Sequence, residues 1–366
     1  KRFQFFLDSK VPQVKFVDRT FNCRHSHAKE IWKYILDHDN GITNFHFEVS
    51  ADLLDEEELE LISQMRKGLI QLEIGVQSTN PDTISEIRRT MNFGKLSQIT
   101  KNIKAMGNIH QHLDLIAGLP FEGYESFERS FNDVYNLMPD QLQLGFLKVL
   151  KGSYMQEHAE EYGLVYKSRP PYEVLKTKWL SYDEISRLKR IEEMVEVYYN
   201  SGQFSHTMTW LVKVFESPFR LYEELGDYYE KNKLFSRSHT RIARYEILLS
   251  FIRERAEERE EFFRQLLVYD LYLRENVKNR PEFAGESSAD KDFLRRFYDR
   301  EEKEPVYLRA YGQMESRKLR KMTHIEVFDY EVDRGMAPEK TVLLFDYQNR
   351  NPLNYEAEIK RIEEEE

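Results

Sequence analysis

A single cysteine, Cys23, occurs in the 366 residues of this chain. One thiol excludes a disulfide framework of the kind that small secreted domains use in place of a large core. The sequence also has no run of eighteen apolar residues, so no membrane-spanning helix is expected. Its first ten residues, KRFQFFLDSK, lack the apolar centre and the cleavage site of a signal peptide. These absences predict a cytoplasmic protein that does not act in a membrane.

Basic residues are also fewer than acidic residues. The chain has 54 Lys and Arg residues against 64 Asp and Glu residues, which gives a formal net charge of −10. This balance argues against a nucleic-acid surface as the main function, so no nucleic-acid partner is expected. At this length a single core would be unusually large, and two domains are therefore expected.

Five short apolar runs have the character of buried strands in a parallel sheet. Two of them, 69–78 (LIQLEIGVQS) and 111–120 (QHLDLIAGLP), carry a glycine near their end and precede residues with helical periodicity. The pattern continues along the first half, with strands at 14–18, 45–51 and 142–149 and helices at 26–38, 55–66, 81–107 and 124–137. Asn80 before Pro81 supports one helix start, because asparagine accepts an unpaired N–H and proline needs no partner there. Residues 1–152 are therefore expected to form a partial βα barrel.

The carboxyl ends of parallel strands share one rim, and polar side chains gather at the predicted rim. They are Asp18, Arg19, Asn22, Glu48, Ser50, Glu73, Gln77, Asp114 and Lys148, together with Gly118. Polar residues in this position predict a binding site rather than a core. Glu73 is expected to point into the barrel or into a helix interface, and it is assigned no catalytic role.

The chain changes character after Gly152. Residues 153–171 are expected to form a linker, and residues 172–366 a second, mostly helical domain. Two alternating stretches near the end predict an antiparallel hairpin, and a charged helical tail follows it. The helices are expected at 172–199, 205–215, 219–232 and 238–277, the hairpin strands at 324–332 and 341–347, and the tail at 356–366. The expected fold class is α/β: a partial βα barrel, then a mostly α-helical domain with a small C-terminal antiparallel β element.

Three blocks of the first half carry a family resemblance. They are GVQSTNPDTISEIRRTMN, DLIAGLPFEGYESFERSF and PDQLQLGFLKVLKGSYM, in this order. Together they resemble the central half of a radical S-adenosylmethionine (radical SAM) barrel, nearest in pattern to the oxygen-independent coproporphyrinogen oxidase branch. The segment VKFVDRTFN is more similar to the barrels attached to cobalamin-binding domains. The resemblance covers roughly residues 11–155, and the second half resembles the domain of unknown function that follows some cobalamin-linked radical barrels.

The resemblance implies an S-adenosylmethionine site at the rim. Gln77 and Asp114 match positions that hold the ribose hydroxyls, and Arg89 matches an arginine that grips the methionine carboxylate. Glu48 matches a rim glutamate near the methionine amine, and Gly118 would let the backbone approach the adenine. The alternative for each residue alone is structural, because Gln77 and Asp114 can cap strand ends and Arg89 can complement a helix dipole.

The scarcity of cysteine separates this chain from that family. Radical enzymes of this type hold a four-iron four-sulfur cluster through a Cys-x-x-x-Cys-x-x-Cys motif after the first strand, since soft thiolates bind such clusters. This sequence, which begins at Lys1, has no such motif. It is therefore expected to be a catalytically inactive fragment, and the missing N-terminal segments of the same polypeptide would bind the cluster and cobalamin. The parent would generate a deoxyadenosyl radical or transfer a methyl group to an organic substrate that the sequence does not identify.

Two other functions stay open. A barrel without a cluster would be a binding or scaffold module, and a cysteine motif upstream in the parent would distinguish the two. A metal- or phosphate-using barrel enzyme is disfavoured, because the chain has no glycine loop suited to phosphate. Cys23, His25 and His27 are residue types that bind zinc, but they lead into a helix, where these positions diverge. No metal site is therefore expected.

Overall fold

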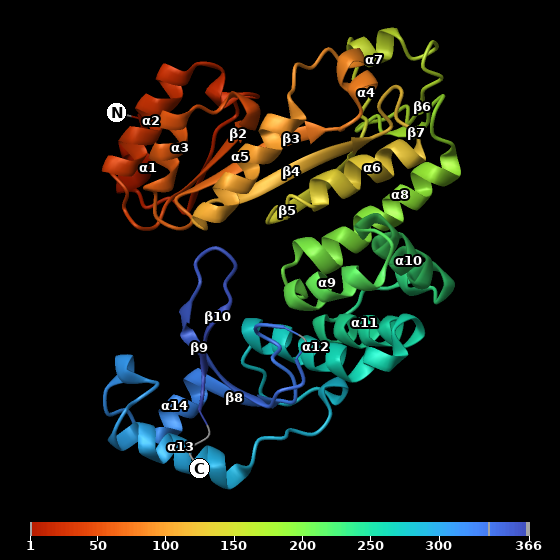
Figure 1. Ribbon diagram of the computed structural model, residues 1–366. Helices are drawn as coiled ribbons and strands as arrows, with labels where there is room; N and C mark the ends of the chain where they lie inside the picture. The colour runs from red at the N-terminus through yellow and green to blue at the C-terminus, as the bar shows by residue number, and fades with distance from the viewer. Residues whose placement is uncertain (1, 336, 364–366) are drawn as a thin grey trace. The chain divides into compact units, whose positions relative to one another are not determined.

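The computed structural model describes residues 2–335 and 337–363 (Figure 1). The chain divides into two compact units. The first holds the chain up to Asn200 together with Glu216–Asp227, and the second holds Ser201–Phe215 and the chain from Tyr228 onward. This division does not coincide with the boundary expected at residue 152.

A parallel sheet of five strands forms the centre of the first unit (Figure 1), and the strand order follows the chain. The strands are β1 (Gln13–Lys15), β2 (Asn44–Val49), β3 (Ile70–Gln77), β4 (His110–Ala117) and β5 (Gln141–Phe146). Each observed strand begins within one or two residues of the start of an expected strand. The predicted α/β class and the partial βα barrel are confirmed.

Helices cover one face of this sheet. Their apolar residues recur at helical spacing, and strand residues such as Leu72 and Ile74 are fully buried on the covered face. Trp32 packs edge-on against Phe47 of β2, with ring centroids 5.9 Å apart. Full burial of each such side chain contributes about 1.5–3 kcal/mol. The helices are α1 (Arg2–Asp8), α2 (His25–Asp37), α3 (Glu56–Ser63), α5 (Phe93–Met106) and α6 (Tyr124–Tyr135).

The stretch 81–107, expected as one helix, forms α4 (Pro81–Glu86) and then α5. The predicted start is confirmed, because Asn80 Oδ1 accepts a hydrogen bond of 3.0 Å from the Asp82 N–H. The helix breaks where Arg88 adopts a φ of 56°, a left-handed conformation that a helix interior excludes. The break separates the next residue, Arg89, from both helices.

Residues 153–171, expected as a linker, are folded. They contain α7 (Tyr154–Glu157) and β6 (Val165–Tyr166), and β6 pairs antiparallel with β7 (Val174–Lys176). Tyr162, which lies in this stretch, is only 2% exposed. Apolar burial therefore holds this segment on the first unit, and α8 (Tyr182–Val195) follows it.

Asn200 closes the outer edge of β5. It ends the π-helical turn that follows α8. Its Oδ1 accepts from the Leu142 N–H and its Nδ2 donates to the Leu142 carbonyl, both at 2.9 Å. Farther along, the Val174 N–H donates to the Leu147 carbonyl, also at 2.9 Å. One carboxamide and one short strand therefore satisfy backbone groups that a sheet edge leaves open.

The second unit is mostly helical, as predicted. One of its helices is buried along nearly its whole length, including every residue from Leu266 to Leu273. The stretch 238–277, expected as one helix, is broken at Ala256, whose φ of −149° is not helical. The helices are α9 (Ser205–Leu211), α11 (Arg241–Arg255), α12 (Glu260–Arg274), α13 (Lys291–Lys303) and α14 (Ser316–Met322), while α10 (Pro218–Lys231) belongs to both units.

The second unit ends in a three-stranded antiparallel sheet of order β10-β9-β8. The expected hairpin is confirmed as β8 (Thr323–Phe328) and β9 (Thr341–Arg350). The helical tail expected at 356–366 is wrong for its described part, which forms β10 (Ala357–Arg361) on the free edge of β9. Residues 364–366 of that expected tail lie outside the described residues. None of the described helices is both long enough and apolar enough to cross a bilayer.

Candidate functional site

The face of the five-stranded sheet opposite the apolar side chains carries mostly polar residues. Side chains alternate between the faces of a strand, so the positions between fully buried Leu72 and Ile74 point to it. The parallel register aligns Glu48 with Glu73, and Glu73 with His112. We call this surface the inner face, and its residues are Lys15, His46, Glu48, Gln71, Glu73, Gln77, His110, His112, Asp114 and Gln143.

Gln77 and Arg89 meet above Gly75. Gln77 ends β3 with a φ of 71°, after a register shift between Gly75 and Gln77. A β-carbon at Gly75 would collide with Gln77 Nε2 and would lie 3.5 Å from Arg89 Nη2. Arg89 Nη2 donates a hydrogen bond of 2.5 Å to the Gly75 carbonyl. A left-handed residue that is not glycine costs free energy, and such conformations cluster at functional sites.

Two carboxyl groups on the inner face hold protons more tightly than usual. Burial, and then repulsion by Glu73 and Glu48, raises the pKa of Asp114 to about 7. Burial and Glu73 also raise the pKa of Glu48. Burial lowers the pKa of Arg89, although Glu48 and Asp114 act in the opposite direction. Each group is close enough to affect the others, so the three share one region of the inner face.

Glu73 is the carboxylate that is already paired. Lys15 Nζ lies 2.9 Å from Glu73 Oε2, and His46 Nε2 lies 2.8 Å from the same oxygen. Burial raises the pKa of Glu73, but the hydrogen bond and charge of Lys15, together with His112 and His46, outweigh it and the net pKa is lowered. Glu73 therefore points into the barrel and stays ionised among its neighbours.

Three histidines that were not predicted as site residues lie on the inner face. Burial lowers the pKa of His46, His110 and His112, in the last case to about 4, so neutral imidazoles are present at neutral pH. The signal was available, because His46 precedes Glu48, and His112 precedes Asp114, by two residues. That spacing places each pair on one face of a strand.

Gly118 differs from the other expected site residues. Its φ is +90°, and a β-carbon there would lie 2.7 Å from Val174 Cγ1. The glycine is therefore required by the packing of β7, and its expected contact with adenine stays a prediction. Gln77 and Arg89 adjoin each other, and Arg89 lies within electrostatic range of Glu48 and Asp114.

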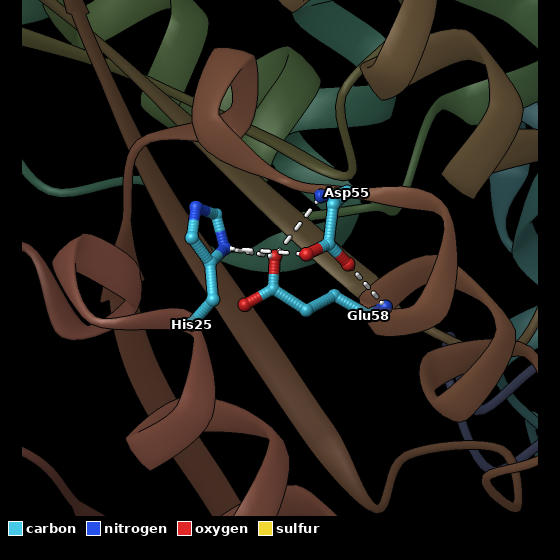
Figure 2. Close-up of side chains that lie close together, drawn as sticks. All are labelled: His25, Asp55 and Glu58. Carbon is cyan, nitrogen blue, oxygen red and sulfur yellow. Dashed lines mark hydrogen bonds and ion pairs between the residues drawn. The ribbon is translucent and has the colours of Figure 1, made fainter.

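A second polar cluster lies at the start of α3. Among residues 2–335 and 337–363, His25, Asp55 and Glu58 are the one group of three possible metal ligands whose ligand atoms lie within 4.8 Å of one another. His25 Nδ1 lies 3.0 Å from Glu58 Oε2 and 3.5 Å from Asp55 Oδ2, and Figure 2 shows the three side chains pointing toward one another. Asp55 and Glu58 form the capping box of α3, and Lys29 Nζ lies 2.8 Å from Asp55 Oδ2. These contacts are those of a helix cap. The exposed Cys23 is not part of the group.

Sequence comparison finds relatives over part of the chain. The oxygen-independent coproporphyrinogen-III oxidase-like protein HemZ of Bacillus subtilis (strain 168) is 26% identical over 172 residues, which cover 38% of this chain and 34% of that protein. The oxygen-independent coproporphyrinogen III oxidase of Salmonella typhimurium is 30% identical over 107 residues, covering 28% of this chain and 23% of that protein. The chain thus spans about a third or less of the length of these curated relatives.

Solved structures also show partial similarity. The radical S-adenosylmethionine methyltransferase TsrM from Kitasatospora setae, solved with cobalamin and a [4Fe-4S] cluster bound, gives a TM-score of 0.39 at 16% identity and covers 45% of this chain and 31% of that one. Coproporphyrinogen III oxidase (HemN) from Escherichia coli gives a TM-score of 0.26 at 16% identity, covering 40% and 48%.

Two family models match the chain, and between them they cover most of it. The model of the radical SAM superfamily matches residues 5–134, which contain β1 to β4 and most of the inner face. The model described as a protein of unknown function (DUF4080) matches residues 160–345, which is about half of the chain. The chain therefore belongs to the DUF4080 family, and its N-terminal part is a radical SAM domain.

Proposed function

We propose that this chain supplies the S-adenosylmethionine-binding surface of a radical SAM enzyme whose full polypeptide is longer and linked to cobalamin. The observation that carries the proposal is the convergence of Arg89, Gln77, Glu48 and Asp114 on the inner face. The full enzyme would act on an organic substrate, either through a deoxyadenosyl radical or by methyl transfer.

The donor set fits S-adenosylmethionine group by group. The guanidinium of Arg89 suits the methionine carboxylate, and the carboxylate of Glu48 suits the amine. The Asp114 carboxylate and the Gln77 amide supply acceptors for the two ribose hydroxyls. Asp114 Oδ1 is buried and makes no hydrogen bond within the described part of the chain. A buried oxygen of this kind calls for a partner, and a hydroxyl would provide one.

The charges support the same ligand. Glu48, Glu73 and Asp114 repel one another, which contributes to the raised pKa values of Glu48 and Asp114. S-adenosylmethionine brings a sulfonium and an ammonium cation, and positive charge near carboxylates relieves that repulsion. The ligand carboxylate adds one negative charge, which Arg89 would neutralise.

The residues present do not fit an iron–sulfur cluster. Such a cluster takes several thiolates, and Cys23 is the one cysteine in the sequence. A cluster held elsewhere in the full polypeptide would supply the electron-transfer chemistry. The part assigned to this chain is to bind and orient S-adenosylmethionine and to exclude water from it.

Binding of S-adenosylmethionine to the isolated chain tests the proposal. Without iron contacts we expect a dissociation constant no tighter than roughly 1 mM, or about −4 kcal/mol. Arg89→Leu is expected to weaken binding at least tenfold. Arg88→Leu is the matched control, because Arg88 stacks at 4.2 Å on the Tyr154 ring instead. Calorimetric titration that finds no binding, or equal losses in both variants, would contradict the proposal.

A second candidate function is a binding or scaffold module in which the barrel has no cluster at all. The single cysteine favours it. The sequence of the parent reading frame decides between the two. A Cys-x-x-x-Cys-x-x-Cys motif roughly fifty residues before Asp18 supports the enzyme, by the spacing expected for the family.

A further inference from the structure

His112 and Asp114 form a close pair on the inner face. They lie two residues apart on β4, so both side chains point the same way. His112 Nε2 lies 3.2 Å from Asp114 Oδ1. Both atoms are buried, and neither makes a well-oriented hydrogen bond to any residue in 2–335 or 337–363. A buried polar atom left without a partner is destabilising, and one proton between the two atoms would satisfy both.

We propose that His112 is a positioning residue that keeps Asp114 protonated in the free protein, and that this proton leaves to solvent when the Asp114 carboxylate binds the ribose of S-adenosylmethionine. The inference rests on the proposed function, because it takes Asp114 as the ribose ligand. The O–H bond of the Asp114 carboxyl group breaks, its electron pair stays on the carboxylate, and buffer accepts the proton.

The surroundings decide which partner carries the proton. The His112 residue is only 7% exposed, and its burial disfavours an imidazolium, which lowers its pKa to about 4. Asp114 is pushed in the opposite direction, to a pKa of about 7, by burial and by two carboxylates. The proton therefore resides on Asp114 at and below neutral pH and is donated to the lone pair of the neutral His112 Nε2.

Charged and titratable groups face this pair from strands β1 to β4 and from the break between α4 and α5. They are Lys15 on β1, His46 and Glu48 on β2, Glu73 on β3, His110 on β4, and Arg89. The carboxylates favour the protonated form of Asp114, whereas the ammonium and guanidinium groups favour the ionised form. The cationic sulfonium of the ligand further favours the ionised form of Asp114. Ligand binding and proton release are therefore linked.

Calorimetric titration with S-adenosylmethionine between pH 5.5 and 8.5, in two buffers of different ionisation enthalpy, measures both affinity and protons released. In the wild-type chain we expect affinity to fall about tenfold per pH unit below about 7, with roughly half a proton released near that pH. In His112→Gln the amide can donate to the carboxylate, so Asp114 ionises at lower pH and the affinity should change less than about threefold between pH 6 and 8. His110→Gln, which lies on the same face and hydrogen-bonds Gln141, should keep the wild-type profile.

Identical pH profiles in the wild type and His112→Gln would overturn the inference. If the wild type binds no S-adenosylmethionine even at pH 8, the proposed function fails, and the shared proton is then tested in the free protein. Carboxyl ¹³C NMR should show Asp114 titrating near neutral pH in the wild type. This measurement does not depend on whether His112→Gln folds. Titration of Asp114 in the ordinary acidic range would overturn the inference in that case as well.

Discussion

Gln77 folds its carboxamide back over the α-carbon of Gly75, too close for any β-carbon at position 75. The left-handed conformation of Gln77 at the end of β3 makes this possible. A glycine two residues earlier is therefore what allows the glutamine side chain to lie beside Arg89 on the inner face. The absence of a β-carbon at Gly75 therefore determines where the Gln77 side chain, a proposed ribose-binding group, can lie.

Gly75→Ala is expected to displace the Gln77 amide with little loss of fold stability, because the colliding atom is the far end of a flexible side chain. Losing about one hydrogen bond, worth roughly 1 kcal/mol, should weaken S-adenosylmethionine binding about fivefold. Calorimetric titration measures the affinity and thermal unfolding measures the stability. Gly94→Ala in α5 is the control, and its affinity should match the wild type. An unchanged affinity in Gly75→Ala would remove Gln77 from the site.

Anaerobic reconstitution with iron and sulfide is expected to leave almost no four-iron cluster on this chain, because one exposed thiol cannot replace three thiolates. Iron and acid-labile sulfide per chain should be measured after desalting. Cys23→Ser should behave like the wild type. A near-stoichiometric cluster on the monomer would contradict the expectation.

The contact between His206 and Asp270 should make the stability of the second unit depend on pH. His206 Nδ1 lies 2.9 Å from Asp270 Oδ1. Burial lowers the pKa of His206, but the hydrogen bond and charge of Asp270 outweigh it, and the net pKa is raised. A raised pKa in the folded state stabilises fully below the unfolded value near 6.5, and this contribution is lost as pH rises through the folded value.

His206→Gln is therefore expected to lower the free energy of unfolding at pH 6 more than at pH 9. Because the His206 side chain is 35% exposed, solvent screening should limit the difference to below about 1 kcal/mol. Urea unfolding at both pH values measures it. His239→Gln is the control, since His239 contacts the Leu234 carbonyl rather than a carboxylate. A loss that grows with pH would contradict the sign of this argument.

Glu301 is a buried carboxylate that holds a turn in the second unit. It is fully buried and accepts hydrogen bonds from the N–H groups of Val306, Tyr307 and Leu308, the last at 2.8 Å. Glu301→Gln keeps one acceptor oxygen and brings an NH₂ group toward these donors, so we expect a loss of about 2 kcal/mol in unfolding free energy. Chemical unfolding measures it, with the exposed Glu304→Gln as a control expected near zero. Equal effects in both variants would show that Glu301 does not support the turn.

The architecture of the first unit could be predicted because local patterns encode it. Leu72, Ile74 and Val76 alternate with polar residues, so the strand and its two faces can be read from spacing alone. The same alternation places Glu48 and Asp114 on one face. Asn80 with Pro81 marks a helix start by chemistry that depends only on neighbours.

Other features depend on parts of the chain that lie far apart. The charged residues after 356 have a helical pattern in the sequence, but they form β10, which pairs with the free edge of β9. Arg361 then pairs with Asp333 at 2.7 Å. The altered pKa of His112 likewise comes from burial and from residues on neighbouring strands. Spacing along one strand could show where His112 points, but not what surrounds it.

Because the outer edge of β5 is closed, a further strand can join the sheet only at its other edge. Asn200 and the start of β7 occupy one side, so no strand from another molecule can add there without displacing them. The opposite side ends at β1, which pairs only with β2 among the strands of the described chain. Val17, just beyond β1, is 88% exposed. Any sixth strand, whether covalently attached or from a partner, would therefore pair beside β1 and would extend the inner face on the side of Lys15.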